Sequence, residues 1–220
     1  MPDLLRIGAL VSGNGTNLQA IIDAIEKKEL EAEITAVISN KKTAGALERT
    51  KKHGLNGIYL DPGNYENNRE YEKEIVRLFG KNRVQWVVLA GYLKIITDEL
   101  LSAYPDRILN IHPSLLPAFT GLHAQEQALK YGVKITGCTV HLVEAGLDSG
   151  PVILQAAVPV LENDTVETLT ERIAKKEHQI YPQVLKWIST RRLKIDGRRV
   201  SILPSSSPSG NEIINPGGIV

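Results

Sequence analysis

The residues best suited to chemistry in this 220-residue chain are Asn110, His112 and Asp148. Each stands near the end of a short apolar run, the first two in segment 110–112 and the third in segment 147–150. An amide N–H can hold an oxyanion, an imidazole can move a proton at neutral pH, and a carboxylate can hold that imidazole in its charged form. Together they would support attack on a carbonyl without a nucleophile from the protein.

Spacing alone does not prove that these three side chains meet. Asp148 lies far from His112 along the chain, and an isolated Asn-x-His pair is more often structural than catalytic. The alternative is that His112 caps a sheet and Asn110 sits in a turn. Strand periodicity nevertheless places Asn110 and His112 on the same face of one strand.

A second candidate site is the glycine-rich turn 12–18, where the first expected strand meets the first expected helix. Its glycines let the backbone turn sharply, and the helix N-terminus presents free N–H groups to an anion. No Gly-Lys-Ser/Thr of a triphosphate loop follows, and Leu18 replaces the third glycine of the dinucleotide fingerprint. We therefore expect a monophosphate here. The alternative is a plain strand-to-helix turn with Thr16 or Asn17 as N-cap.

The elements that must position these residues follow from hydropathy. Apolar runs of strand length alternate with helix-period segments, which predicts an α/β fold: a Rossmann-like, mostly parallel twisted sheet with helices on both faces. Ligands bind beyond the carboxyl ends of the strands in such folds. The expected strands are 7–11, 34–39, 57–60, 86–90 and 108–111. The expected helices are 17–27, 44–53 and 67–79, the last with its charged residues outside and Tyr71, Ile75 and Leu78 inside.

The pattern changes in the second half of the chain. A short helix is expected at 124–131, followed by strands 136–143 and 152–158 that are added antiparallel to the sheet. A long helix is expected at 165–188, and Pro182 should kink or interrupt it. Residues 192–203 suggest a terminal hairpin that turns on Asp196-Gly197.

Composition bounds the class of protein. Apolar residues make up 42% of the chain and charged residues 23%, as in ordinary globular proteins. The net charge of +1 gives no reason to expect nucleic acid or an anionic membrane surface as a partner. The single Cys138 excludes an internal disulfide framework and fits a reducing compartment, so we expect a cytoplasmic enzyme or binding protein. No metal is expected, since no zinc-binding spacing of His, Cys or Glu occurs.

Several motifs, in order along the chain, resemble the folate-dependent formyltransferases. They are NIHPSLLP at 110–117, GLHA at 121–124 and EAGLDSGP at 144–151. The opening SGNGTNLQAII at 12–22 and VLAGY at 88–92 resemble the branch of that family that acts on glycinamide ribonucleotide. The resemblance covers about residues 7–187.

The resemblance implies transfer of a formyl group from 10-formyltetrahydrofolate, as co-substrate, to the amine of glycinamide ribonucleotide in de novo purine biosynthesis. The amine would attack directly and give a tetrahedral intermediate. Asn110 would hold the oxyanion, His112 would protonate the departing N10, and Asp148 would favour the imidazolium. The partners would be small molecules, and the sequence leaves open whether the protein is a monomer or a homodimer.

Binding residues also follow from the resemblance. The phosphate of the nucleotide would contact Gly15, Thr16 and Asn17, and its ribose would contact Glu177. Arg69 would line the folate entrance. Together with Asn110, the folate would be enclosed by two segments: Leu93, Lys94, Ile95 and Ile96, then Glu144, Ala145, Gly146, Leu147 and Asp148.

Four further residues are expected to lie near the site. His123 and His141 either line the site or are buried structural histidines. The family often has a basic residue at the position of Ala118 and a proline at that of Thr120, so this chain departs from the pattern beside the site.

The resemblance also implies a division of the chain. A single formyltransferase domain is expected over residues 1–189, with a phosphate-binding half at about 1–100 and a folate and catalytic half at about 101–189. The residue pattern, and not the resemblance, predicts a terminal hairpin at 190–203 and a flexible tail at 204–220.

Three alternatives remain open at this point. A 10-formyltetrahydrofolate hydrolase would share the three reactive residues, but that family carries an N-terminal regulatory domain and has no need of the turn 12–18. A formyltransferase acting on methionyl-transfer RNA has a further C-terminal domain to hold the RNA. A non-catalytic nucleotide-binding module would have no reason to keep all three reactive side chains.

Overall fold

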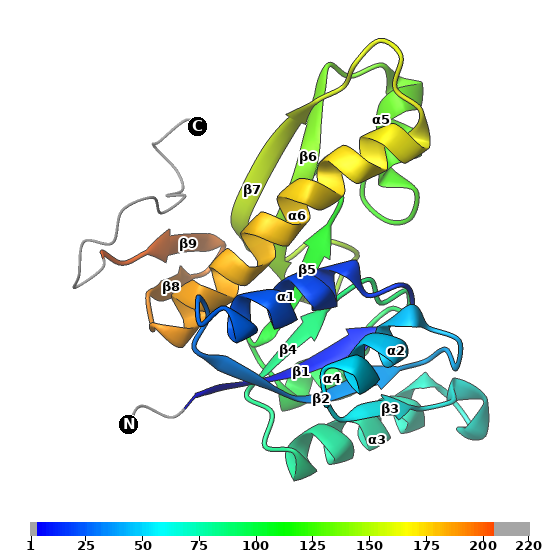
Figure 1. Ribbon diagram of the computed structural model, residues 1–220, viewed down its shortest axis with the longest axis vertical. Helices are drawn as coiled ribbons and strands as arrows, with labels where there is room; N and C mark the ends of the chain where they lie inside the picture. Colours follow the sequence, from blue (N-terminus) through cyan, green and yellow to red (C-terminus); the bar gives the residue numbers. More distant parts are fainter. Residues whose placement is uncertain (1–3, 205–220) are drawn as a thin grey trace.

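A seven-stranded mixed sheet forms the centre of the molecule, in the order β3-β2-β1-β4-β5-β6-β7 (Figure 1). The computed structural model describes residues 4–204. The strands from β3 to β5 run parallel, and β6 and β7 are added antiparallel at one edge. The strands are β1 (Leu5–Val11), β2 (Ala32–Ser39), β3 (Gly57–Tyr59), β4 (Trp86–Leu89), β5 (Ile108–His112), β6 (Ile135–Leu142) and β7 (Val152–Pro159).

Helices cover both faces of the sheet, because successive side chains of a buried strand point to opposite sides. On one face, the side chains of Ile7, Ala9 and Val11 pack in a core shared with α1 and α6. On the other, Leu10 packs in a core shared with α3 and α4. The helices are α1 (Thr16–Glu26), α2 (Gly45–Lys52), α3 (Asn68–Lys81), α4 (Asp98–Ala103), α5 (Ala124–Tyr131) and α6 (Val166–Ser189). The expected α/β class is confirmed.

The helix α6 runs across the sheet and is anchored on two central strands, β4 and β5 (Figure 1). The buried hydroxyl of Tyr181 lies 3.1 Å from the carbonyl oxygens of both Leu89 and Leu109. These contacts fix one face of α6 at the edge of the sheet where the candidate residues gather.

Two local expectations on α3 were wrong, and one of the two outcomes expected for α6 is not found. Pro182 does not interrupt α6, which continues as one helix to Ser189, because the long apolar face of α6 is packed on the sheet. Glu72 is buried rather than outside on α3, since it accepts hydrogen bonds from the segment after β4. Leu78 is only half-buried, and Phe79 takes the inner position.

Two short elements had no signal in the hydropathy pattern. They are α4 and a 3-10 turn, η1 (Pro62–Asn64). Both are shorter than the two helical turns over which an apolar periodicity can be recognised.

The chain beyond α6 forms the expected hairpin, a separate two-stranded sheet of β8 (Leu193–Asp196) and β9 (Arg199–Ile202). Apart from Pro204, the expected tail 204–220 lies outside the described residues. Over residues 4–204, no helix is long and apolar enough to cross a membrane.

Candidate active site

The side chains of Asn110, His112 and Asp148 meet at the carboxyl end of β5. Asn110 and His112 lie two residues apart on β5, and Asp148 stands in the loop between β6 and β7. Oδ2 of Asp148 lies 3.3 Å from Nδ1 of His112, and Oδ1 lies 3.5 Å from Nδ2 of Asn110. The structure therefore brings together the three residues that the sequence singled out.

Both ring nitrogens of His112 face acceptors. Nε2 lies 2.8 Å from the carbonyl oxygen of Phe119, and Nδ1 faces the carboxylate of Asp148. The ring is almost completely buried. The Phe119 contact makes Nε2 a donor, and a proton on Nδ1 as well would complete an ion pair with Asp148.

Asp148 is held in place by the loops on either side of it. Its Oδ2 accepts a 2.7 Å hydrogen bond from the backbone N–H of Gly121, and its backbone adopts a φ of 48°, in the left-handed region. Gly150, two residues later, packs so closely on the carbonyl of Leu142 that no side chain would fit. A non-glycine residue with positive φ at this point is typical of functional sites that the surrounding structure holds firmly.

A fourth residue, His141, completes the cluster. It lies opposite Asn110 in the antiparallel pairing of β5 with β6. Its Nε2 is 3.2 Å from Nδ2 of Asn110 and 3.7 Å from Oδ1 of Asp148. Burial lowers the pKa of His141, which favours the neutral imidazole.

His123 is not part of this cluster. It is the N-cap residue of α5, its side chain is 75% exposed, and it faces Glu126 at 3.9 Å. Of the two further histidines that the sequence offered, only His141 reaches the reactive side chains.

The loop 113–123 is held without the family's proline at position 120. Ser114 Oγ donates to the carbonyl of Ala118, and Gln127 Nε2 donates to the carbonyl of Thr120 at 3.1 Å. Both departures from the family pattern, Ala118 and Thr120, have exposed side chains on this loop.

The glycine-rich turn leads from β1 into α1 at the same edge of the sheet. Gly15 is the N-cap residue with a φ of 71° and makes no side-chain cap, so neither Thr16 nor Asn17 takes that role. A Cβ at Gly15 would lie 2.7 Å from the Cβ of Ala46, which leaves room only for glycine. The backbone N–H groups of the first helical turn are left for another acceptor.

Asn17 and Glu177 form a direct link between this turn and α6. Nδ2 of Asn17 donates to Oε2 of Glu177 at 2.9 Å. Burial raises the pKa of Glu177, and the hydrogen bond from Asn17 opposes that rise. The two residues expected to contact phosphate and ribose are therefore neighbours.

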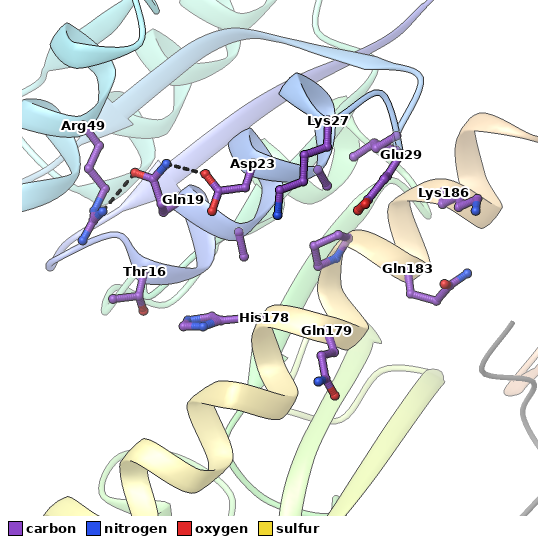
Figure 2. A pocket seen from close by; sticks show the side chains of 14 residues that line it. Thr16, Gln19, Asp23, Lys27, Glu29, Arg49, His178, Gln179, Gln183 and Lys186 are labelled. Atoms are coloured by element: carbon purple, nitrogen blue, oxygen red, sulfur yellow. Dashed lines mark hydrogen bonds between the residues drawn. The ribbon is translucent and has the colours of Figure 1, made fainter. Parts of the chain in front are cut away.

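A cavity of about 610 Å³ lies between α1 and α6 and reaches the turn at Thr16 (Figure 2). Arg49 of α2 stands at this end. Its Nε donates to the carbonyl of Asn14 at 2.8 Å and its Nη1 to Oε1 of Gln19 at 2.9 Å. Burial lowers the pKa of His178 on the opposite wall, and the charge of Arg49 adds to that effect. Arg49 is thus a permanent cation beside the turn, and nothing in the sequence pattern marked it as part of the site.

The two segments expected to enclose the folate carry exposed apolar side chains. Leu93 is 59% exposed and Ile95 is 77% exposed, and Leu147 is exposed on the loop that holds Asp148. Arg69 pairs through its Nε with Glu99 of α4 at 2.7 Å, and its side chain is 64% exposed. Its neighbour Asn68 donates to the carbonyl of Ile95 at 3.3 Å.

Residues 5–185 match the family model described as "Formyl transferase". The chain belongs to the formyl transferase family. The phosphoribosylglycinamide formyltransferase of Escherichia coli K12 is 41% identical to this formyl transferase over 203 residues, which is 89% of this chain and 96% of the relative.

Solved structures agree. The glycinamide ribonucleotide transformylase 1 of Symbiobacterium toebii superposes with a TM-score of 0.90 at 49% identity, over 91% of this chain and 95% of that one. A formyltetrahydrofolate deformylase from Pseudomonas syringae pv. tomato reaches a TM-score of 0.85 at 26% identity, over 92% of this chain and 67% of that one. This formyl transferase therefore shares its fold with both classes, with much higher sequence identity to the first.

Proposed function

We propose that the protein is a phosphoribosylglycinamide formyltransferase, which moves the formyl group of 10-formyltetrahydrofolate to the amine of glycinamide ribonucleotide. The observation that carries this proposal is the meeting of Asn110, His112 and Asp148 at one edge of a sheet that also presents the glycine-rich turn. The three side chains suit acyl transfer, and the glycine-rich turn suits binding of a phosphate. The chain would do this with one catalytic domain over residues 1–189.

The reaction begins with attack of the substrate amine on the formyl carbon. The second N–H of the Asn110 amide donates to the oxyanion of the tetrahedral intermediate, a role typically worth about 10²–10³ in rate. His112 donates a proton to the departing N10 from Nε2, which exchanges its contact with the Phe119 carbonyl for the substrate, while Asp148 holds the imidazolium through Nδ1. The amine loses a proton in the same sequence, and Asp148 is the carboxylate placed to accept it through water.

Substrate binding divides between two places. Backbone N–H groups of Gly15, Thr16 and Asn17 would hold the phosphate, and the buried Glu177 would accept hydrogen bonds from the ribose hydroxyls. The pteridine would lie against the exposed apolar side chains of Leu93, Ile95 and Leu147. Flat heteroaromatic rings are bound by surfaces of this kind, with a few polar groups for orientation.

A 10-formyltetrahydrofolate hydrolase is the second candidate, since the solved deformylase shares the fold. The turn with Gly15 as N-cap and the Asn17–Glu177 pair favour the transferase, because a hydrolase has no nucleotide to bind.

The test is formyl transfer from 10-formyl-5,8-dideazafolate, followed by absorbance, with and without glycinamide ribonucleotide. Turnover that requires the nucleotide supports the transferase. Deformylation without the nucleotide would identify a hydrolase, and no turnover with nucleotide binding retained would identify a binding module. His112→Ala should abolish the turnover, while the matched variant His123→Ala should not.

A further inference from the structure

The segment 91–97, which includes the proposed folate wall, has no regular secondary structure between β4 and α4. Its path is set by contacts with other elements. The N–H of Leu93 donates to Oγ of Ser12 at 3.0 Å, and Asn68 of α3 donates to the carbonyl of Ile95 at 3.3 Å. The shape of this segment therefore depends on its neighbours rather than on its own backbone hydrogen bonds.

Glu72 of α3 makes the largest set of these contacts. Its two carboxylate oxygens accept from the backbone N–H of Thr97 at 2.9 and 3.1 Å, and Oε2 accepts from Oγ1 of Thr97 at 2.6 Å. The N–H of Leu100, in the first turn of α4, lies 3.3 Å from the same oxygen, and Nδ2 of Asn68 lies 3.3 Å from Oε1.

The burial of Glu72 makes these contacts significant. Its residue is only 1% exposed, and a carboxylate removed from water is costly unless donors replace the water. Here the donors are the last residue of the segment and the open N-terminus of α4, where a negative charge is favoured. One buried side chain thus joins α3, the end of the segment 91–97 and the start of α4.

Neighbouring contacts continue the same interface. Nζ of Lys94 lies 5.7 Å from the centre of the Tyr71 ring, and the side chains of Tyr92 and Ile96 pack against the core formed with α3. Tyr92 and Ile96 face inward, while Leu93 and Ile95 remain exposed. Because of this alternation, Leu93 and Ile95 lie on the same outer surface of the segment. They keep this arrangement only if the far end of the segment stays attached to α3.

We propose that Glu72 is a positioning residue for the folate co-substrate. It holds Thr97, and through Thr97 it fixes the surface that Leu93 and Ile95 offer to the pteridine, without contacting the ligand itself. This inference rests on the proposed function. It predicts that loss of the Glu72 carboxylate weakens folate binding and leaves nucleotide binding at the glycine-rich turn unchanged.

The test is calorimetric titration of Glu72→Gln with 10-formyl-5,8-dideazafolate and, separately, with glycinamide ribonucleotide. The amide replaces one acceptor oxygen by an NH₂ group that faces the donors of Thr97. We expect the Kd for the folate analogue to rise about tenfold or more, as for hydrogen bonds to a charged group. The Kd for the nucleotide should stay within about twofold of wild type. The matched control is Glu74→Gln, which removes a carboxylate paired with Arg77 on the same helix.

A second pair of variants keeps the test decisive if Glu72→Gln does not fold. Thr97→Ala removes one donor to Glu72, whereas Thr97→Ser keeps it. Thr97→Ala should raise the folate KM severalfold at nearly unchanged kcat and nucleotide KM, and Thr97→Ser should restore the wild-type value.

Two results would overturn the inference: unchanged folate affinity in a folded Glu72→Gln, or equal weakening of both ligands. These results can be distinguished from failure of the proposed function itself. In that case the wild-type protein would bind no folate analogue or would transfer no formyl group.

Discussion

Nδ2 of Asn110 lies 3.2 Å from Nε2 of His141, and this contact determines which way the Asn110 amide faces. Nδ1 of His141 lies 2.7 Å from the carbonyl oxygen of Leu142, so Nδ1 carries the ring proton and Nε2 is the acceptor. Only the NH₂ group of Asn110 can donate to that acceptor. One of its two N–H bonds is thereby used, and the second is left facing the cluster, where Oδ1 of Asp148 lies 3.5 Å from the same nitrogen.

Replacing His141 with Phe should lower kcat by about 10- to 100-fold, because an amide that is free to rotate no longer presents its N–H to the oxyanion. The KM values for both substrates should change little, since the loss is in the transition state. Steady-state kinetics measure this split, with His123→Ala as the control on an exposed histidine. A kcat for His141→Phe equal to that of wild type would show that Asn110 keeps its orientation without this contact.

The lowered pKa of His141 also predicts a pH dependence. Protonated Nε2 would become a donor and would repel the NH₂ group of Asn110, so activity should fall in acid. Because the folded-state pKa lies below the ordinary 6.5, the stability that neutral His141 contributes is present above 6.5 and is lost as pH falls through the lowered pKa. Profiles of kcat and of Tm against pH should both show this loss, and the contribution should be missing from His141→Phe.

The Asp148→Asn variant tests the ion pair with His112. Asparagine can still accept from the N–H of Gly121, which leaves the loop in place, but it carries no charge to hold an imidazolium. We expect kcat to fall by about 10²–10⁴ with small changes in KM, the range typical of general acid–base groups. Single-turnover rates would measure the chemical step, and Ser149→Ala provides a control in the same loop. A loss in binding alone would contradict the assigned role.

The sequence predicted the sheet and the longer helices because each buries a periodic set of apolar residues. It also offered Asn110, His112 and Asp148, each near the end of a short apolar run, and the resemblance to the formyltransferases singled them out. It could not establish that Asp148 meets His112, because that contact depends on the pairing of β5 with β6 and on the loop after β6.

The missed residues share one physical cause: their partners are distant in sequence. Glu72 is on a helix whose pattern predicts exposed charges, and its burial depends on Thr97. Arg49 looks like an ordinary basic residue near a helix end, yet it donates to Asn14, 35 positions away. His141, by contrast, was offered by the sequence as either lining the site or buried, and the pairing of β6 with β5 places it opposite Asn110.

Arg49 should set nucleotide affinity through the turn that it braces. Arg49→Ala removes the hydrogen bond to the Asn14 carbonyl and a positive charge beside the proposed phosphate site. We expect the KM for glycinamide ribonucleotide to rise about tenfold, with the folate KM unchanged. Arg49→Lys should recover part of the loss, because it restores charge without the fork of donors. Lys51→Ala is the control on the same helix. An equal rise in the nucleotide KM of that variant would mean that Arg49 acts only through its positive charge and not through its hydrogen bonds.

Glu177→Gln separates function from stability at the proposed ribose site. Glu177 is buried and its pKa is raised, so at neutral pH the ionised carboxylate lowers the free energy of unfolding. This destabilisation is present above the raised pKa and disappears as pH falls toward the ordinary 4.5. Glutamine keeps an acceptor for Asn17 and has no charge to bury. The variant should therefore have a Tm at pH 7 equal to or above that of wild type, and the difference should shrink in acid. Its nucleotide KM should nevertheless rise about tenfold, because a neutral amide accepts the ribose hydroxyls less strongly than a carboxylate. Thermal unfolding across pH and steady-state kinetics give the two readings, and a Tm that falls together with nucleotide affinity would mean that Glu177 serves the fold rather than the substrate.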